Sequence, residues 1–427
     1  MRTLLSLSVA VLVGLLMTRV AKPLKLPSVT AYLVAGVLIG PYCLGLLGIQ
    51  GLGFPTRQDV ESLSLISDVA LGFIAFSIGS EFRLSELKKT GRQAFVIGVL
   101  QALAATFLVD LALIVVCLIT KGKLSIAQAI TLGAIATATA PAATLMVVRQ
   151  YKAKGPLVDL LLPIVALDDA VGLVVFAVSF GIAKALNTNS FDIISIVVDP
   201  LFEIVCSLVL GAFGGWVLTK LETLFNSNTN RLNMTIALVF LVSALAMAEF
   251  KIGPVTIGFS SLLTCMMLGT LFCNLCPLSE EIMAKADRWT SPLFAAFFVI
   301  SGAELDLGVF NVLIGVVYIL TRSLGKYLGA HYSAKLMKCE PQICKYLGIT
   351  LLPQAGVALG MCVTARQLGA EGDLIRNITL FAILIYELVG PLLTKMALQA
   401  AGEIHPMEDA VKNRRQINLE KANAEKK

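Results

Sequence analysis

Two adjacent aspartates, Asp168 and Asp169, lie at the centre of an apolar stretch that runs from about residue 157 to residue 184. An ionised carboxylate at the middle of a bilayer costs at least ~2.5–3.5 kcal/mol, so a pair at this depth indicates a functional site. Neighbouring helical positions point ~100° apart, which lets each carboxylate bind a different partner while it feels the other's charge. Burial and mutual repulsion disfavour two negative charges at once, so the pair is suited to exchanging a proton for a cation. The alternative is that the pair only joins helices through hydrogen bonds.

Two cations and a third acid lie in other apolar stretches. Lys326 is within the stretch 308–335, and Arg322 lies one helical turn before it on the same face. A lysine at this depth needs a carboxylate partner, unless its long side chain extends to the cytoplasmic end of the helix. Glu387 lies at the centre of the last apolar stretch and is a predicted partner of Arg322.

Proline interrupts two of the apolar stretches. The segment Thr137-Ala138-Thr139-Ala140-Pro141 interrupts the stretch 126–148, and Pro353-Gln354-Ala355-Gly356 interrupts the stretch 345–366. Proline lacks a backbone N–H and clashes with the preceding turn, so each stretch is predicted to form two half-helices. Broken helices in corresponding halves of a chain indicate a transport site at the bilayer midplane. The alternative is a pair of ordinary proline kinks that neighbouring helices accommodate.

The elements that position these residues are predicted to be membrane-spanning helices. The chain is 57% hydrophobic and 15% charged, whereas charged residues make up ~25% of soluble domains. Its apolar stretches are long enough to cross a hydrocarbon layer of ~30 Å. The predicted fold class is therefore all-α, a polytopic membrane protein with about thirteen spans, near residues 3–20, 28–48, 60–79, 93–119, 126–148, 157–184, 193–219, 232–249, 254–273, 290–304, 308–335, 345–366 and 374–400.

Two short segments of the chain match each other and predict inverted repeats. Gly79-Ser80-Glu81 ends the third span, and Gly302-Ala303-Glu304 ends the tenth, each followed by a similar apolar pattern. The third span exits inward and the tenth outward if the spans alternate as predicted. Repeats of opposite orientation are typical of secondary transporters.

Basic residues indicate how the chain is oriented. Lys and Arg are concentrated in alternate loops and in the C-terminal tail. In a cell membrane this asymmetry places the N-terminus outside the cell and the C-terminus in the cytoplasm. This placement accounts for the net charge of +6, so the bilayer and not a nucleic acid is the predicted partner.

Three features together resemble the bacterial electrogenic sodium/proton antiporters, the double-aspartate branch of the monovalent cation:proton antiporter superfamily. They are the pair in Ala166-Leu167-Asp168-Asp169-Ala170, the Thr-x-Thr-Ala-Pro break one span earlier, and the run Gly325-Lys326-x-x-Gly329 two spans before the end. The resemblance covers nearly the whole chain, and the order and spacing of the motifs are more specific than any one of them.

The resemblance implies a role for each residue of the site. Asp169 binds the cation and the proton, Asp168 pairs with Lys326, and Thr137 and Thr139 lie near the ion. Hard oxygen ligands suit Na⁺ or Li⁺. Some relatives carry an acidic residue in the first break, which this chain lacks, so the sequence leaves open how the positive helix ends are compensated.

The resemblance also implies a division of the chain. Residues 1–92 and 185–304 would form a panel that makes a homodimer. Residues 93–184 and 305–400 would form an ion-transport core that moves against the panel, with a linker helix at the start of 185–304. Residues 401–427 would form a short cytoplasmic tail.

The expected activity is exchange of Na⁺ or Li⁺ for H⁺ by alternating access, electrogenic if two protons move per sodium, with a role in pH homeostasis. Neither an enzymatic reaction nor an organic cofactor is expected. The alternatives are a K⁺/H⁺ antiporter, a sodium-coupled organic-anion symporter on the same fold, and a pore or sensor gated by the broken helices. Adjacent aspartates argue against the symporter because they would repel an anionic substrate.

Overall fold

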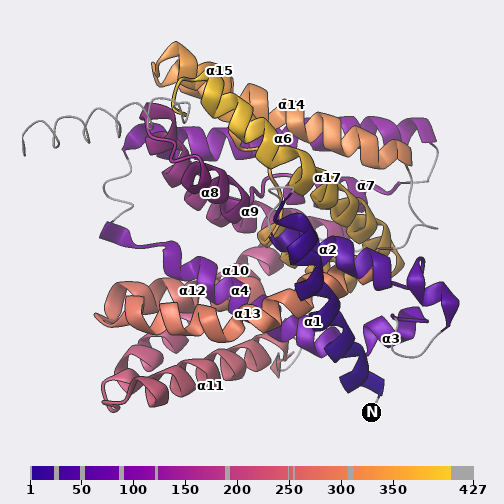
Figure 1. Cartoon of the computed structure of the whole chain (residues 1–427), viewed down its shortest axis with the longest axis vertical. Coiled ribbons are helices and arrows are strands. Elements are labelled where there is room, and N and C mark those ends of the chain that lie inside the picture. The colour runs from indigo at the N-terminus through magenta and orange to yellow at the C-terminus, as the bar shows by residue number, and fades with distance from the viewer. Residues whose placement is uncertain are drawn as a thin grey trace, which may run out of the picture.

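The computed structural model describes residues 2–23, 28–48, 53–85, 91–120, 124–187, 193–248, 250–252, 255–305 and 312–404. These residues are mainly helical (Figure 1). Eight of their helices are long and apolar enough to cross a membrane, and shorter apolar helices account for further predicted spans. The predicted class, a polytopic helical membrane protein, is confirmed. From residue 405 onward the predicted tail lies outside the described residues.

Each of the thirteen predicted spans corresponds to one helix or to a pair of half-helices. The unbroken helices are α1 (Arg2–Ala21), α2 (Ser28–Ile39), α4 (Ser64–Glu81), α6 (Arg92–Thr120), α9 (Pro156–Asn187), α10 (Ile193–Glu222), α11 (Asn228–Met247), α12 (Ser261–Leu275), α13 (Ser279–Ala303), α14 (Val312–Leu336) and α17 (Ala370–Ala400). Shorter elements lie between them: η1 (Leu44–Leu47), α3 (Arg57–Glu61), β1 (Phe250–Ile252), β2 (Val255–Ile257) and η2 (Ala365–Leu368).

Two predicted helix starts are wrong by seven residues or more. The span predicted at 254–273 begins only at Ser261, because the chain before it forms the antiparallel hairpin of β1 and β2. The span predicted at 290–304 belongs to α13, which begins at Ser279. Its first turns carry Glu280, Glu281, Lys285 and other charged residues, which weaken the apolar signal without interrupting the helix.

Both proline-containing spans are broken, as predicted. The first consists of α7 (Ile126–Ile135) and α8 (Pro141–Gln150), and the second of α15 (Pro341–Thr350) and α16 (Val357–Thr364). Pro141 is the first residue of α8, where its missing N–H has no helical partner to lose. Gly356, before α16, has φ +47°, a conformation that other residues rarely adopt.

The two breaks are in contact with each other. The N–H of Ala140, at the N-terminal end of α8, donates to the carbonyl of Pro353 at 2.9 Å. The hydroxyl of Thr144 donates to the carbonyl of Thr350 at 3.3 Å. The backbone groups that each break exposes are therefore partly satisfied by the other break.

Glycines bring α14 against α6 at backbone contact distance. A Cβ atom on Gly325 would lie 2.7 Å from the Cα of Ala105, and one on Gly329 would lie 2.8 Å from the Cα of Gln101. Small residues spaced four apart allow such close approach of membrane helices. This seam places Lys326, which lies between the two glycines in the sequence, beside α6.

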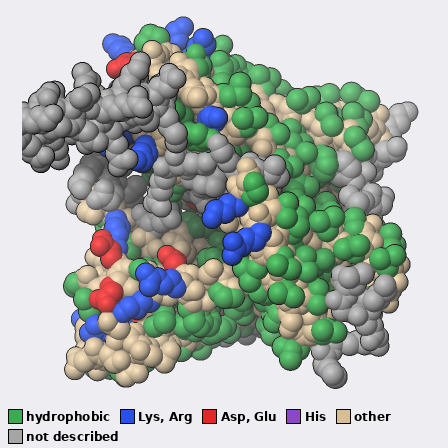
Figure 2. Space-filling model, viewed as in Figure 1, with side chains coloured by type: hydrophobic (Ala, Val, Ile, Leu, Met, Phe, Trp, Pro, Cys, Tyr) green, Lys and Arg blue, Asp and Glu red, His purple; other side chains and the backbone are tan. Residues whose placement is uncertain are grey.

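The helices are arranged in two groups along the long axis of the molecule. Figure 1 shows α6, α14 and α15 towards one end and α11, α12 and α13 towards the other. Figure 2 shows the surface hollowed between the groups, in the region of α8 and α12, with charged side chains beside the hollow.

Candidate ion-binding site

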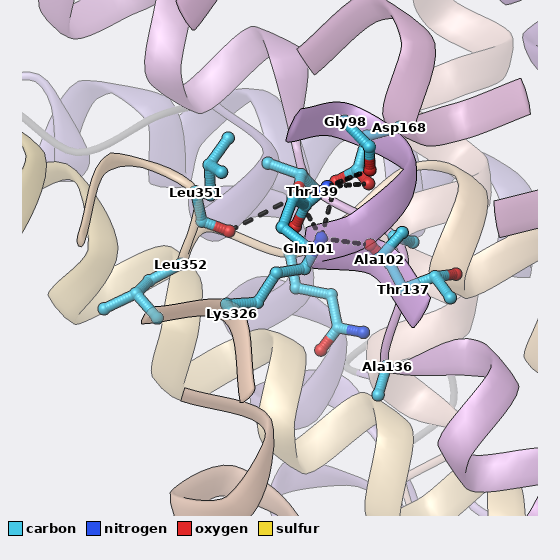
Figure 3. Close-up of polar contacts among 12 residues, drawn as sticks. Gly98, Gln101, Ala102, Ala136, Thr137, Thr139, Asp168, Lys326, Leu351 and Leu352 are labelled. Carbon is cyan, nitrogen blue, oxygen red and sulfur yellow. Dashed lines mark hydrogen bonds and ion pairs between the residues drawn. The ribbon is translucent and has the colours of Figure 1, made fainter. Parts of the chain in front are cut away.

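Asp168 lies near the middle of α9 and is fully buried. Its Oδ1 accepts a hydrogen bond from Gln101 Nε2 of α6 at 2.6 Å. Its Oδ2 accepts from the hydroxyl of Thr139 in the first break and from Lys326 Nζ of α14 at 2.6 Å. Figure 3 shows these side chains converging from separate elements. The carboxylate therefore joins α9 to α6, to α14 and to the first break.

Lys326 is also fully buried, so it does not extend to the cytoplasmic end of the helix. Besides Asp168, its ammonium donates to the carbonyl of Thr137 and to the hydroxyl of Thr139, the latter at 3.0 Å. The predicted contact between Lys326 and Asp168 is thus present. An ammonium and a carboxylate at full burial are compatible with the low-dielectric interior only as a hydrogen-bonded pair.

Asp169 is 2% exposed and lies next to this pair on α9. The first break passes close to the same part of α9. A Cβ atom on Gly172 would lie 2.7 Å from the hydroxyl oxygen of Thr137, so glycine at this position lets the break approach. The structure thus brings both aspartates and both predicted threonines into one region. The ligand roles of Asp169, Thr137 and Thr139 stay predictions.

Arg322 binds the backbone of both breaks. Its Nε donates to the carbonyl of Ala136 at 3.1 Å, its Nη2 to Ala138 at 2.6 Å, and its Nη1 to Leu352 at 2.8 Å. Its guanidinium lies over the ring of Tyr386, 4.4 Å from the centroid. The C-terminal ends of α7 and α15 carry partial negative charge, which Arg322 and Lys326 offset. The two cations that were predicted to share one face of α14 are therefore directed at helix ends.

The predicted pairing of Arg322 with Glu387 is wrong. The carboxylate of Glu387 is 1% exposed, and its Oε2 accepts from the hydroxyl of Thr30 on α2 at 3.5 Å. The prediction assumed that a buried arginine needs a carboxylate partner. The guanidinium of Arg322 instead donates to three carbonyls at the broken helix ends, which satisfy it without an acid.

Sequence reasoning missed two glutamines of the site. Gln101 Nε2 donates to Gly98 O at 2.9 Å as well as to Asp168, and Gln354 Nε2 donates to Ile135 O at 2.9 Å and to Tyr318 Oη at 3.1 Å. Both side chains are fully buried. A glutamine within an apolar stretch could have indicated a buried polar contact, because unsatisfied polar groups are costly in a membrane.

Comparison with known proteins gives the same family for nearly the whole chain. The family model described as "Sodium/hydrogen exchanger, transmembrane" matches residues 7–400. Among curated relatives from Synechocystis sp., the high-affinity Na⁺/H⁺ antiporter NhaS3 is 25% identical over 336 residues, 72% of this chain and 69% of that protein. The Na⁺/H⁺ antiporter NhaS4 is 24% identical over an alignment that covers 91% of this chain and 95% of that protein. NhaS5 is 24% identical, and the chain spans 54% of its length.

A solved structure shares the fold. The sodium proton antiporter MjNhaP1 from Methanocaldococcus jannaschii superposes with a TM-score of 0.70 at 18% identity, covering 93% of this chain and 99% of that one. With the family model matched over residues 7–400, the chain belongs to the transmembrane sodium/hydrogen exchanger family.

Proposed function

We propose that the chain exchanges Na⁺ for H⁺ by alternating access, with Asp169 as the carrier of cation and proton and Asp168 as the partner of Lys326. One observation carries this proposal: a buried lysine–carboxylate pair lies where two broken helices meet, beside a second buried carboxylate. Names of relatives that describe Na⁺/H⁺ antiport support the same activity. The family favours exchange over the symporter and pore alternatives.

The exchange is proposed to be electrogenic. Asp169 releases its proton when Na⁺ binds, and the Asp168–Lys326 pair supplies the second proton of a cycle that returns two protons per sodium. Carboxylate, hydroxyl and carbonyl oxygens also suit Li⁺. The site is thus a coupled group of three ionisable side chains and not a single titrating residue.

The moving parts are proposed to follow the division predicted from the sequence. Residues 93–184 and 305–400 would form the core, and residues 1–92 and 185–304 a panel that forms a homodimer. The protein is proposed to reside in the cell membrane with its N-terminus outside and its C-terminus in the cytoplasm, where exchange would serve pH homeostasis.

Ion pairs join the proposed panel to the proposed core at one end of the molecule. Glu304, which follows α13, pairs with Arg366 of η2 and with Arg376 of α17, the latter at 3.8 Å. Asp373 of α17 pairs with Arg57 of α3 at 2.9 Å. In the proposed orientation this end faces outward. We therefore propose that these ion pairs hold the panel against the core on the outer side, at α3, α13 and α17.

Removing these ion pairs is expected to favour the outward-open state. The double substitution Glu304→Gln, Asp373→Asn should weaken outer closure by ~1–2 kcal/mol, a shift of roughly five- to thirtyfold in population. Cys362 is 1% exposed within α16 and gives a native reporter. With the other cysteines replaced, its modification by a membrane-impermeant maleimide from outside should accelerate by a similar factor.

The matched control for this experiment is Glu281→Gln. Glu281 pairs with Lys285 at 2.9 Å within α13, so this substitution removes an ion pair that takes no part in the contact between panel and core. An unchanged labelling rate in the double variant, or an equal acceleration in the control, would contradict the outer closure.

Proton movement in proteoliposomes tests the activity itself. Purified protein should show saturable dye-reported ΔpH on addition of Na⁺ or Li⁺, and clamping the voltage with K⁺ and valinomycin should change the rate. The double variant Asp168→Asn, Asp169→Asn should show none. Sodium-driven exchange that survives in that variant would overturn the assignment. Exchange with K⁺ alone, measured with a voltage clamp other than valinomycin, would favour the K⁺/H⁺ alternative.

A further inference from the structure

A carboxylate that follows α17 caps the N-terminus of α9. Oε1 of Glu403 accepts from the N–H of Leu157 at 2.6 Å, and Oε2 accepts from the N–H of Val158 at 2.9 Å. The carbonyl of Glu403 also accepts from the N–H of Lys154 at 3.1 Å. The side chain is buried, at 7% exposure. These contacts tie the end of α17 to the start of the helix that carries both aspartates.

The sequence at the start of α9 requires an acceptor from elsewhere and leaves room for it. Gly155 precedes the helix and has no side-chain oxygen to cap it, and Pro156 has no N–H. The N–H groups of Leu157 and Val158 are therefore the first that need a partner. A Cβ atom on Gly155 would lie 2.5 Å from Cδ of Glu403, so glycine admits the carboxylate.

The C-terminus of α17 fixes the direction of Glu403. The N–H of Gly402 donates to the carbonyl of Gln399 and the N–H of Glu403 to that of Leu398, both at 3.0 Å. Gly402 has φ +79°. This is the Schellman pattern that ends many helices. Because the loop is hydrogen-bonded in this way, the carboxylate is held at α9 by a defined backbone and not by a flexible chain end.

We propose that Glu403 is a positioning residue for cation exchange, which fixes the axial position of α9 and thereby of Asp168 and Asp169. Asp168 lies twelve residues after Pro156, about 18 Å along the axis at ~1.5 Å per residue. α9 is continuous from Pro156 through its internal Pro163 to both carboxylates, so an axial shift at its start moves them. Small misplacements of reacting groups have large kinetic effects. This inference rests on the proposed function.

Replacing Glu403 with Ala is expected to raise the apparent KM for Na⁺ by roughly three- to tenfold while the maximal rate changes by about twofold or less. Glu403→Gln keeps one acceptor oxygen and should restore most of the lost affinity. Asp159→Asn is the matched control, because Asp159 is an exposed carboxylate in the first turn of the same helix. A lower melting temperature with unchanged KM, or an equal KM rise in the control, would overturn the inference.

A double-mutant cycle separates the contact from general damage. Gly155→Ala should raise the KM in the native background, because the new Cβ displaces the carboxylate, and should add little in Glu403→Ala. Backbone strain at Gly155, which has φ +157°, is common to both backgrounds and cancels. Additive effects would contradict the proposed contact. A wild-type protein without exchange activity would refute the proposed function, whereas active protein with KM indifferent to Glu403 would refute only this inference.

Discussion

Replacing Asp169 with Asn is expected to abolish Na⁺-driven proton movement while the protein stays folded. The substitution removes the proposed cation ligand but leaves the bonds of Asp168 with Gln101, Thr139 and Lys326 in place. Replacing Asp168 with Asn has a different expected result. It leaves the ammonium of Lys326 buried without its counter-charge, which costs ~3–5 kcal/mol in comparable cases.

Two measurements on the same preparations separate these roles. Dye-reported ΔpH in proteoliposomes gives the activity, and thermal unfolding in detergent gives the stability. Asp159→Asn, an exposed change on the same helix, is the control for both. If the Asp169→Asn protein is active and the Asp168→Asn protein is stable but inactive, then Asp168 and not Asp169 is the cation and proton carrier.

Replacing Arg322 with Met is expected to destabilise the protein by about 4.5–9 kcal/mol. Three hydrogen bonds from one guanidinium are lost, and hydrogen bonds to charged groups contribute ~1.5–3 kcal/mol each. The carbonyls of Ala136, Ala138 and Leu352 would remain buried without this donor. Arg322→Lys should recover only part of the loss, because a lysine cannot reproduce the planar fork that reaches both breaks.

The control is Lys335→Met, which removes an exposed cation from the last turn of the same helix. Thermal unfolding of the purified variants, with and without Na⁺, reports the difference. An Arg322→Met protein as stable as the Lys335→Met protein would mean that Arg322 does not hold the two breaks together.

Hydropathy and proline placement predicted most of the architecture from the sequence, because each depends on local chemistry. A stretch long enough to span the bilayer forms a helix there, and Pro141 prevents the preceding helix from continuing. The hairpin before Ser261 was not predictable in this way. Its second strand, Val255–Ile257, is apolar like the helix that follows, so hydropathy alone does not distinguish the two.

The site was only partly predictable, for a related reason. The contact of Lys326 with Asp168 followed from a family resemblance in the sequence. The partners of Arg322 are carbonyl groups, which every residue carries, so no side-chain pattern reports them. Gln101 contacts Asp168 across 67 positions of the chain, and that proximity depends on the packing of α6 against α9, where a Cβ atom on Gly98 would lie 3.6 Å from Leu167.

The reciprocal contact of the two breaks constrains the order of events during synthesis. The carbonyls of the first break accept hydrogen bonds from side chains that lie 184 to 189 residues later in the chain, at Arg322 and Lys326. Ala140 finds its own partner later still, at Pro353. The N-terminal half therefore leaves the ribosome with a site that it cannot complete, and its final conformation forms only after α14 and α15 have been inserted beside it. Maturation of the transport site is a late step of assembly, set by translation of the second half.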